Sequence, residues 1–493
     1  MSITYLSAKQ LASKIQKKAI TSREALEAFI ERNEHFGPRL NAVITTDYAS
    51  ARKRADAADA ALARGENWGP LHGVPMTIKD TWEVVGMTAT SGAPQLKHHQ
   101  PKKNATIVES LLNAGAIIYG KTNVPLFATD LQSFNKVHGT THNPWDLDRT
   151  PGGSSGGAAA ALAAGLTPVE FGSDIGGSIR TPAHYCGVFG HKSTHGIVSM
   201  RGHIPGPPGT LSEPDLAVGG PMARSAEDLE MILDIVASAN QDDRQAWKIK
   251  LPGCSKKSLK DFKVLAWLED PLSPIDQELQ QSYRSLVESL KAEGVHIDIG
   301  TPNADPLSKY YELYLNLLGS AIGASIQPIG RNAMYWGSTV IAKIGNTFKL
   351  PPLVDHFMRG VGQSHIDWLR SNERRNRLIA KFSRVFDEYD AVLMPIVPTT
   401  AIKHQQKPDL PFRHIIVNGE KRNYMENLIW ISVATLLGMP STSMPIGQDV
   451  NGLPINIQIM GDRFQDKTTI RFASLVSKKL GGFKVPPGFT PGH

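Results

Sequence analysis

Gly-Ser-Asp-Ile-Gly-Gly-Ser-Ile-Arg, at residues 172–180, is the stretch on which the interpretation of the whole chain depends, and Gly-Gly-Ser-Ser-Gly-Gly at residues 152–157 accompanies it. Glycine has no Cβ atom, so it adopts positive φ angles and lets several backbone N–H groups converge on one atom. Such a cup suits the oxygen that becomes negative when a serine attacks a carbonyl carbon, and one donor contributes about 3 kcal/mol in the transition state. The first stretch therefore indicates Ser178 as a candidate nucleophile, with an oxyanion hole made by the N–H groups of Ile175, Gly176, Gly177 and Ser178.

A serine hydroxyl is a weak nucleophile until a base takes its proton, and Lys79 is the candidate base. The segment 73–80 has the pattern of an apolar strand that brings this lysine from the interior to a polar edge. Being half neutral at pH 7 requires the lysine pKa to fall by about 3 units, or roughly 4 to 5 kcal/mol, which burial can supply. The alternative for an isolated lysine is a surface salt bridge with a neighbouring carboxylate such as Asp80.

Three other functions are typical of glycine–serine clusters. A flexible linker does not fit, because residues 152–157 run straight into the alanine-rich, helix-forming segment 158–164. A phosphate-binding loop does not fit, because neither cluster has the glycine and lysine placement of the known phosphate motifs. A nucleophile elbow stays open: its G-x-S-x-G pattern matches with Ser155 at the centre and would make the chain an α/β-hydrolase, although it leaves Lys79 without a role.

Five segments in a fixed order carry a resemblance to a known family. They are residues 73–80, 120–123, 143–145, 150–157 and 174–180, and matching stretches resume at 394–395 and 438–461. In this order the chain resembles the amidase signature family, which includes stand-alone bacterial amidases and fatty-acid amide hydrolase. Ser154 and Ser178 also have the spacing that this family requires.

The resemblance implies a role for each residue of the motifs. Ser178 would be the nucleophile, Ser154 would relay its proton and Lys79 would be the base. The resemblance also implies a cis peptide bond between Gly153 and Ser154. Supporting residues would be Ser155, as a hydrogen-bonding partner, and Asp174 and Arg180, which would brace the turn that carries Ser178.

The chain alternates helical and strand patterns, as α/β proteins do. The resemblance implies an amidase signature fold, with a large mixed, twisted β-sheet core flanked by helices on both faces. Because no internal repeat or linker is visible, we expect one domain over residues 1–493, with an N-terminal helical clasp at about 1–65 and the signature core at about 71–230. A capping box at Thr21 predicts a helix to about residue 35, and residues 71–79 predict a buried strand.

The segment at about 306–363 resembles the family least, and we expect it to contain the variable substrate-pocket region. Its aromatic residues either pack as core or line the pocket for the acyl or leaving group. Peripheral membrane contact is a weaker alternative, because no long, uniformly amphipathic helix is visible there. The aromatic residues concerned are Tyr310, Tyr311, Tyr314, Tyr335, Trp336 and Phe348.

Composition excludes several classes of partner. The net charge of +7 is dispersed in short clusters without interleaved aromatic residues, so we expect no nucleic-acid partner. No apolar run is long enough for stable membrane insertion, and the first residues lack a secretory signal. Two isolated cysteines fit a reducing compartment, so a cytoplasmic location is expected. The 16 histidines lack metal-site spacing, so we expect no metal and no cofactor.

The function expected from these residues is hydrolysis of a small-molecule carboxylic amide through a serine acyl-enzyme, with esters, anilides or carbamates as further substrates. One alternative is the A subunit of a glutamine-dependent aminoacyl-tRNA amidotransferase, which hydrolyses glutamine and needs partner subunits. The apolar segment 428–433, which has no carboxylate to meet a glutamine ammonium, favours the stand-alone amidase. A second alternative is a non-catalytic binding protein on the same fold. The acyl and amine preferences and the formation of a homodimer stay open.

Overall fold

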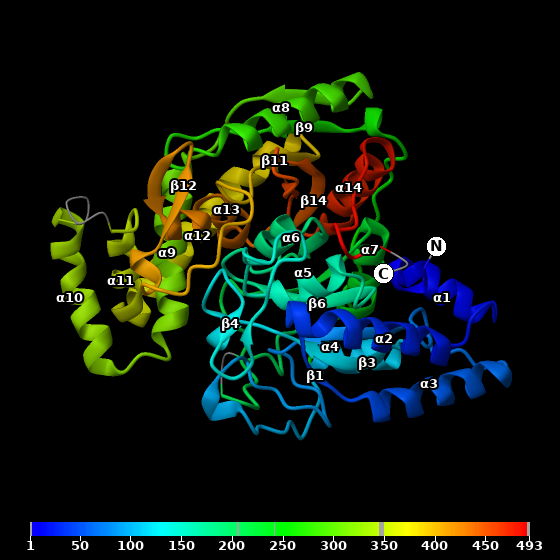
Figure 1. The fold of residues 1–493 in the computed structure, drawn as a ribbon. Helices are drawn as coiled ribbons and strands as arrows, with labels where there is room; N and C mark the ends of the chain where they lie inside the picture. Colours follow the sequence, from blue (N-terminus) through cyan, green and yellow to red (C-terminus); the bar gives the residue numbers. More distant parts are fainter. Residues whose placement is uncertain (1, 205–206, 241, 345–349, 491–493) are drawn as a thin grey trace.

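The computed structural model describes residues 2–204, 207–240, 242–344 and 350–490 (Figure 1). Its helices are α1 (Ala8–Gln16), α2 (Ser22–Leu40), α3 (Tyr48–Ala63), α4 (Thr106–Asn113), α5 (Gly156–Ala163), α6 (Arg180–Cys186), α7 (Ala226–Val236), α8 (Gln277–Ala292), α9 (Leu307–Gly323), α10 (Pro328–Ile344), α11 (Val354–Gly362), α12 (His365–Ser383), α13 (Ile429–Leu436) and α14 (Asp466–Leu480). Its strands are β1 (Val43–Thr46), β2 (Pro75–Lys79), β3 (Ile117–Thr122), β4 (Phe134–Asn135), β5 (Gly139–Thr140), β6 (Val169–Asp174), β7 (Phe189–Lys192), β8 (Val218–Ala223), β9 (Lys263–Ala266), β10 (His296–Ile299), β11 (Ala391–Met394), β12 (His414–Val417), β13 (Glu420–Asn423), β14 (Ser441–Gln448) and β15 (Pro454–Met460).

The centre of the molecule is an 8-stranded sheet in the order β10-β9-β11-β15-β14-β7-β8-β6. Strands β9, β10 and β11 run parallel, whereas the pairs from β11 to β6 are antiparallel. The expected large mixed, twisted sheet is therefore confirmed.

A smaller sheet, in the order β1-β3-β2, lies against the β6 edge of the large one. Side chains rather than backbone ladders join the two: the Thr77 N–H donates to Thr167 Oγ1 (3.1 Å), and Thr77 Oγ1 donates to Glu170 Oε1 (2.8 Å). Along these contacts β2 and β6 run in the same direction, so their carboxyl ends meet at one edge. That edge is where Lys79 and the 172–180 stretch come together.

Helices cover both faces of the large sheet, as two neighbouring residues of β7 show. A Cβ atom on Gly190 would lie 2.7 Å from Ile179 and 3.1 Å from Ala183, so this face is covered closely by α6. The next residue, His191, points the other way, because successive side chains of a strand alternate. Its Nε2 lies 3.0 Å from Asp466 Oδ1 at the start of α14.

The N-terminal helices are fastened to the centre by buried polar contacts. The backbone N–H groups of Ala8 and Lys9, at the start of α1, donate to the Asp228 carboxylate of α7 at 3.0 and 2.9 Å. Arg224 donates to the carbonyl oxygens of Thr4 and Leu6. These contacts are what a clasp requires, while the proposed division of the chain into clasp, core and pocket region stays a prediction.

Two expected elements differ at their ends. The capping box at Thr21 is confirmed, but α2 continues to Leu40, where Asn41 adopts a left-handed conformation (φ 50°) and ends it. The strand expected over 71–79 begins only at Pro75. Residues before it form a turn around Gly73 (φ 71°), in which the Val74 N–H donates to the Leu71 carbonyl.

The segment expected to hold the pocket folds as α9, α10 and α11, which stand together at one end of the molecule (Figure 1). Helix α9 packs against α13 and α11, so it links this end to the core. Phe348 lies outside the described residues. Across the part of the chain that is described, no helix has both the length and the apolar character needed to cross a membrane.

Candidate active site

Lys79, the last residue of β2, meets the serine cluster of residues 152–157. Its Nζ lies 2.7 Å from Ser154 Oγ and 2.8 Å from Ser155 Oγ. The peptide bond between Gly153 and Ser154 is cis, as the resemblance implied. A Cβ atom on Gly153 would lie 2.6 Å from the Gln132 nitrogen, so only glycine fits where this loop crosses its neighbour. The loop thus presents the Ser154 hydroxyl directly to the lysine.

Ser178 lies in the turn between β6 and α6, beside the same loop. Its carbonyl accepts a hydrogen bond from the Ser155 N–H (3.1 Å), which fixes the two serine segments side by side. Ser178 keeps 5% of its surface exposed, against 1% for Ser154 and 0% for Lys79. Within the described residues its Oγ makes no hydrogen bond to another side chain. Of the three, Ser178 therefore has the largest exposed fraction.

Asp174 holds this turn in shape. It accepts hydrogen bonds from the Gly177 N–H (2.9 Å) and the Ile179 N–H (3.1 Å), and Gly177 has the positive φ (84°) that the turn needs. Burial alone would raise the pKa of Asp174, but the charge and hydrogen bonds of Arg180 lower it to about 2. The carboxylate is therefore ionised at neutral pH and keeps accepting these hydrogen bonds.

The N–H groups expected to form the oxyanion hole are not all free. Because the Gly177 N–H donates to Asp174, it is already engaged. The N–H groups of Ile175, Gly176 and Ser178 make no hydrogen bond within the described part of the chain, which leaves them available to a ligand. Several such donors aimed at one oxygen suit a developing negative charge.

Arg180 is the partner on which Asp174 depends, since the two form a fully buried ion pair (2.9 Å). Arg180→Met leaves a buried carboxylate without its counter-charge, so we expect the free energy of unfolding to fall by about 3 to 5 kcal/mol. Urea denaturation measures this loss. The matched control is Arg377→Met, which breaks an exposed pair with Glu373 and should barely move the midpoint. Equal effects of the two substitutions would contradict the bracing role.

Burial changes the charge state of Lys79. It lowers the pKa to about 7, against the opposing influence of the charges on Asp174 and Glu170. The salt bridge considered for Lys79 with Asp80 is wrong: Asp80 pairs instead with Lys121, at 2.8 Å and out of contact with solvent. Lys79 is thus a lysine that loses its proton near neutral pH, as a general base must.

Glu170 is a further titratable group behind the lysine, and sequence reasoning did not single it out. It accepts hydrogen bonds from Thr77 Oγ1 (2.8 Å), Thr122 Oγ1 (2.9 Å) and the Phe171 N–H (2.9 Å). Burial raises its pKa to about 7, even though these hydrogen bonds act in the opposite direction. Its charge therefore changes in the same pH range as that of Lys79.

Two more residues joined to Lys79 were also missed. Ser173 Oγ lies 3.0 Å from Lys79 Nζ, and His203 Nε2 lies 2.8 Å from Ser173 Oγ. Ser173 is part of the quoted stretch, and its alternation with Asp174 along β6 was a usable signal. His203 belongs to no recognised motif, so no signal was available for it.

The nucleophile-elbow alternative loses support from the geometry. Ser155 is fully buried and its Oγ contacts Lys79 Nζ. No histidine side chain within the described residues is hydrogen-bonded to it. Ser155 has the contacts of a supporting residue, with its hydroxyl directed at the Ser173 carbonyl (3.5 Å).

Apolar residues from distant segments stand over the Ser178 turn. Tyr314 of α9 donates its hydroxyl to the Ile175 carbonyl (3.0 Å). A Cβ atom on Gly176 would lie 3.3 Å from the Leu428 side chain, and one on Gly177 would lie 3.2 Å from Ile431. One of the expected aromatic residues therefore reaches the site. Trp336, by contrast, is 75% exposed on α10.

Lys192, the last residue of β7, and Ser193 after it form contacts of their own. Ser193 Oγ donates to the Gly219 carbonyl (2.9 Å). Lys192 Nζ donates to the Met439 carbonyl (2.8 Å), and burial lowers its pKa to about 7. Neither side chain contacts Lys79, Ser154 or Ser178.

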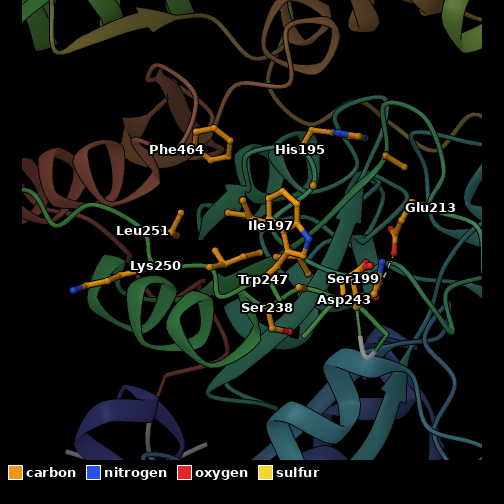
Figure 2. Close-up of a pocket in the computed structure, with 16 residues that line it drawn as sticks. His195, Ile197, Ser199, Glu213, Ser238, Asp243, Trp247, Lys250, Leu251 and Phe464 are labelled. Carbon is orange, nitrogen blue, oxygen red and sulfur yellow. Dashed lines mark hydrogen bonds between the residues drawn. The ribbon is translucent and has the colours of Figure 1, made fainter. Parts of the chain in front are cut away.

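A cavity of about 620 Å³ lies apart from the lysine–serine cluster. Figure 2 shows it between Ile197, Trp247 and Phe464, with Glu213 and Asp243 at its polar side. Its lining shares no residue with the cluster. Among the described residues, no group of three or more His, Cys, Asp or Glu side chains is placed to hold a metal ion.

Comparison with known proteins identifies a family and a shared fold. A family model described as Amidase matches residues 24–470. The A subunit of the glutamyl-tRNA(Gln) amidotransferase of Carboxydothermus hydrogenoformans is 31% identical over 99% of this chain and 100% of its own. A crystal structure of an amidase is 27% identical with a TM-score of 0.76, covering 97% of this chain and 100% of the other. Fatty acid amide hydrolase, at 24% identity, shares the fold with a TM-score of 0.78 over 97% of this chain and 86% of its own.

Proposed function

Because this chain belongs to the amidase family, whose members hydrolyse carbon–nitrogen bonds, we propose that it hydrolyses carboxylic amides through an acyl-enzyme on Ser178. Lys79 is the general base and Ser154 relays the proton between the two. The observation that carries the proposal is the 2.7 Å contact between Lys79 Nζ and Ser154 Oγ, made by a buried lysine whose pKa is lowered to about 7.

The first half of the reaction forms the acyl-enzyme. Ser178 Oγ attacks the carbonyl carbon while its proton passes to Ser154, whose own proton passes to Lys79. The N–H groups of the cup hold the oxyanion. The proton then returns along the same relay to the amide nitrogen, the carbon–nitrogen bond breaks, and the amine leaves.

The second half releases the acid. A water molecule gives its proton to the relay and attacks the ester carbonyl, and the carbon–oxygen bond to Ser178 breaks as that serine regains a proton. The sum is one amide and one water converted to one carboxylic acid and one amine, with every residue returned to its starting state.

The side chains over the Ser178 turn favour an apolar acyl group. The aliphatic side chains of Leu428 and Ile431 lie next to the turn. The Tyr314 hydroxyl donates to the Ile175 carbonyl and is therefore already hydrogen-bonded. Carboxylates in this neighbourhood are paired: Asp130 with Arg413, and Glu426 with Arg422. An ammonium group on a substrate would therefore compete with existing ion pairs.

A second candidate is the A subunit of a glutamine-dependent amidotransferase acting on charged tRNA. It is favoured by the name of a relative that is 31% identical over 99% of this chain. In that role the same relay would hydrolyse glutamine and supply ammonia, and partner subunits would be needed for transfer.

Substrate competition separates the two candidates. We expect the purified chain to release ammonia from benzamide or aniline from acetanilide at least about tenfold faster, by kcat/KM, than it releases ammonia from glutamine, because an apolar wall rejects a charged substrate. Coupled ammonia assays and aniline absorbance measure the rates. Release from glutamine alone would favour the amidotransferase role.

A non-catalytic protein on this fold is the third candidate, and an activated ester tests it. An acyl-enzyme mechanism predicts a burst of p-nitrophenol from p-nitrophenyl acetate, with an amplitude near one per chain, followed by slower turnover. A chain that gives no burst and no turnover on any ester or amide would be a binding protein.

A further inference from the structure

A line of hydrogen bonds continues from Lys79 beyond Ser154 and Ser155. Ser173 Oγ lies 3.0 Å from Lys79 Nζ, and His203 Nε2 lies 2.8 Å from Ser173 Oγ. None of the proton transfers proposed above passes through His203. The contact therefore needs another explanation.

The positions of the protons on Lys79 and the surrounding hydroxyls explain the contact between Ser173 and His203. As an ammonium, Lys79 donates to the oxygens of Ser154, Ser155 and Ser173. As a neutral amine it has two N–H bonds and one lone pair, and it acts as a base only when that lone pair faces Ser154. The nearest acceptors for the two N–H bonds are then the Ser155 and Ser173 hydroxyls, with the Ser173 carbonyl farther away at 3.5 Å, and neither hydroxyl may point its own proton at the nitrogen.

Each of the two flanking hydroxyls has a hydrogen-bond acceptor other than Lys79. Ser155 Oγ directs its O–H at the Ser173 carbonyl (3.5 Å). Ser173 Oγ lies 2.8 Å from His203 Nε2, which accepts the Ser173 O–H when the ring carries its proton on Nδ1. With both protons turned outward, the remaining position around Lys79 Nζ belongs to the Ser154 hydroxyl.

We propose that His203 is a positioning residue for the relay: by accepting the Ser173 O–H at Nε2, it keeps Ser173 an acceptor toward Lys79 and so aims the lysine lone pair at Ser154. The inference rests on the proposed function, since it assigns a role within that relay. It requires His203 to be neutral, with its proton on Nδ1.

Backbone and ring contacts hold the His203 side chain in place beside Ser173. It pairs with the residues that follow β2: the Ile204 N–H donates to the Thr81 carbonyl (2.7 Å), and the Glu83 N–H donates to the Gly202 carbonyl (2.9 Å). The ring of Trp82 packs edge-on against the histidine at 4.6 Å between centroids. The histidine is thereby tied to the same segment that carries Lys79.

The surroundings also keep His203 neutral. Burial lowers its pKa well below the usual value, and the charge of Lys79 lowers it further. The groups that contact its ring from β6 and from the segment after β2 are Ser173 and Trp82, which carry no charge. Protonation of His203 would turn Ser173 toward Lys79 and block the base.

Substitution of His203 tests the proposal. In His203→Leu the Ser173 hydroxyl is released to donate to the neutral lysine, so kcat should fall about 10- to 100-fold while KM changes little. A hydrogen bond from Ser173 to the neutral amine disfavours the ammonium form of Lys79 and lowers its pKa. The pH range in which kcat rises should therefore move to lower pH. His203→Gln, which keeps an acceptor near the Nε2 position, should restore most of kcat and the original limb. His414→Leu, on the β12–β13 hairpin, is the matched control and should behave as wild type.

A double-mutant cycle with Ser173→Ala makes the test independent of folding losses. If His203 acts through the Ser173 hydroxyl, His203→Leu should lower kcat no further in the Ser173→Ala background. Additive losses of kcat, an unmoved pH limb in His203→Leu or no rescue by His203→Gln would overturn the proposal. Hydrolysis of benzamide or acetanilide by the wild type and its loss in Ser178→Ala test the proposed function separately, so failure of the positioning role alone is recognisable.

Discussion

Replacing Ser178 by alanine is expected to lower kcat for amide hydrolysis by about 10⁴-fold or more, because the change removes the atom that forms the acyl-enzyme. The fold should be unaffected: Ser178 Oγ makes no side-chain hydrogen bond within the described residues, and its backbone contact with the Ser155 N–H persists in alanine. Initial rates on benzamide and thermal unfolding of the same samples measure the two quantities. A large loss of rate at an unchanged Tm is the signature of a nucleophile.

Ser155→Ala is the control that decides between the two serine motifs. It removes one acceptor of Lys79 but leaves the relay through Ser154, so its loss should be much smaller than that of Ser178→Ala. The reverse order, with Ser155→Ala inactive and Ser178→Ala active, would restore the nucleophile elbow. A fluorophosphonate that reacts with activated serines should accordingly label a peptide that contains Ser178, and label on Ser155 would count against the assignment.

Part of the candidate site was predictable because its determinants are local in the chain, whereas the large mixed sheet was expected from the family resemblance. Ser154 was assigned from the family resemblance, whereas turn chemistry in the 172–180 stretch indicated Ser178, and an apolar run ending at Lys79 indicated a strand. The capping box at Thr21 specified a helix start in the same way. In these local cases neighbours within a few residues carry the signal.

The contacts of the site that were not predicted depend on pairing between segments distant in the sequence. Asp80 is neutralised by Lys121 because β2 and β3 run parallel in a register that places Ile78 opposite Lys121. His203 reaches the site because its loop pairs with the segment after β2. No spacing in the sequence encodes these contacts.

The second large effect is expected at the base. Lys79→Met fills a similar volume without an amine, so kcat/KM for amides should fall by about 10²- to 10⁴-fold, the range that general-base catalysis contributes. In the wild type the rate should rise with pH through about 7, since Lys79 is protonated below its pKa of about 7 and accepts a proton only above it. The variant should lose this limb. Rates from pH 5 to 9 on one neutral amide, whose own charge is constant, measure both.

Within the described residues, Lys192 and Glu170 are buried groups whose pKa is also shifted to about 7, so the limb needs its own assignment. The pKa of Lys192 is lowered to about 7 and that of Glu170 is raised to about 7. Lys192→Met should keep the limb in place, because Lys192 donates only to backbone carbonyls. Glu170→Gln should keep it but move it to lower pH, because the Glu170 charge raises the pKa of Lys79. If the rise of rate with pH disappears in Lys192→Met and persists in Lys79→Met, the general base is Lys192 and not Lys79.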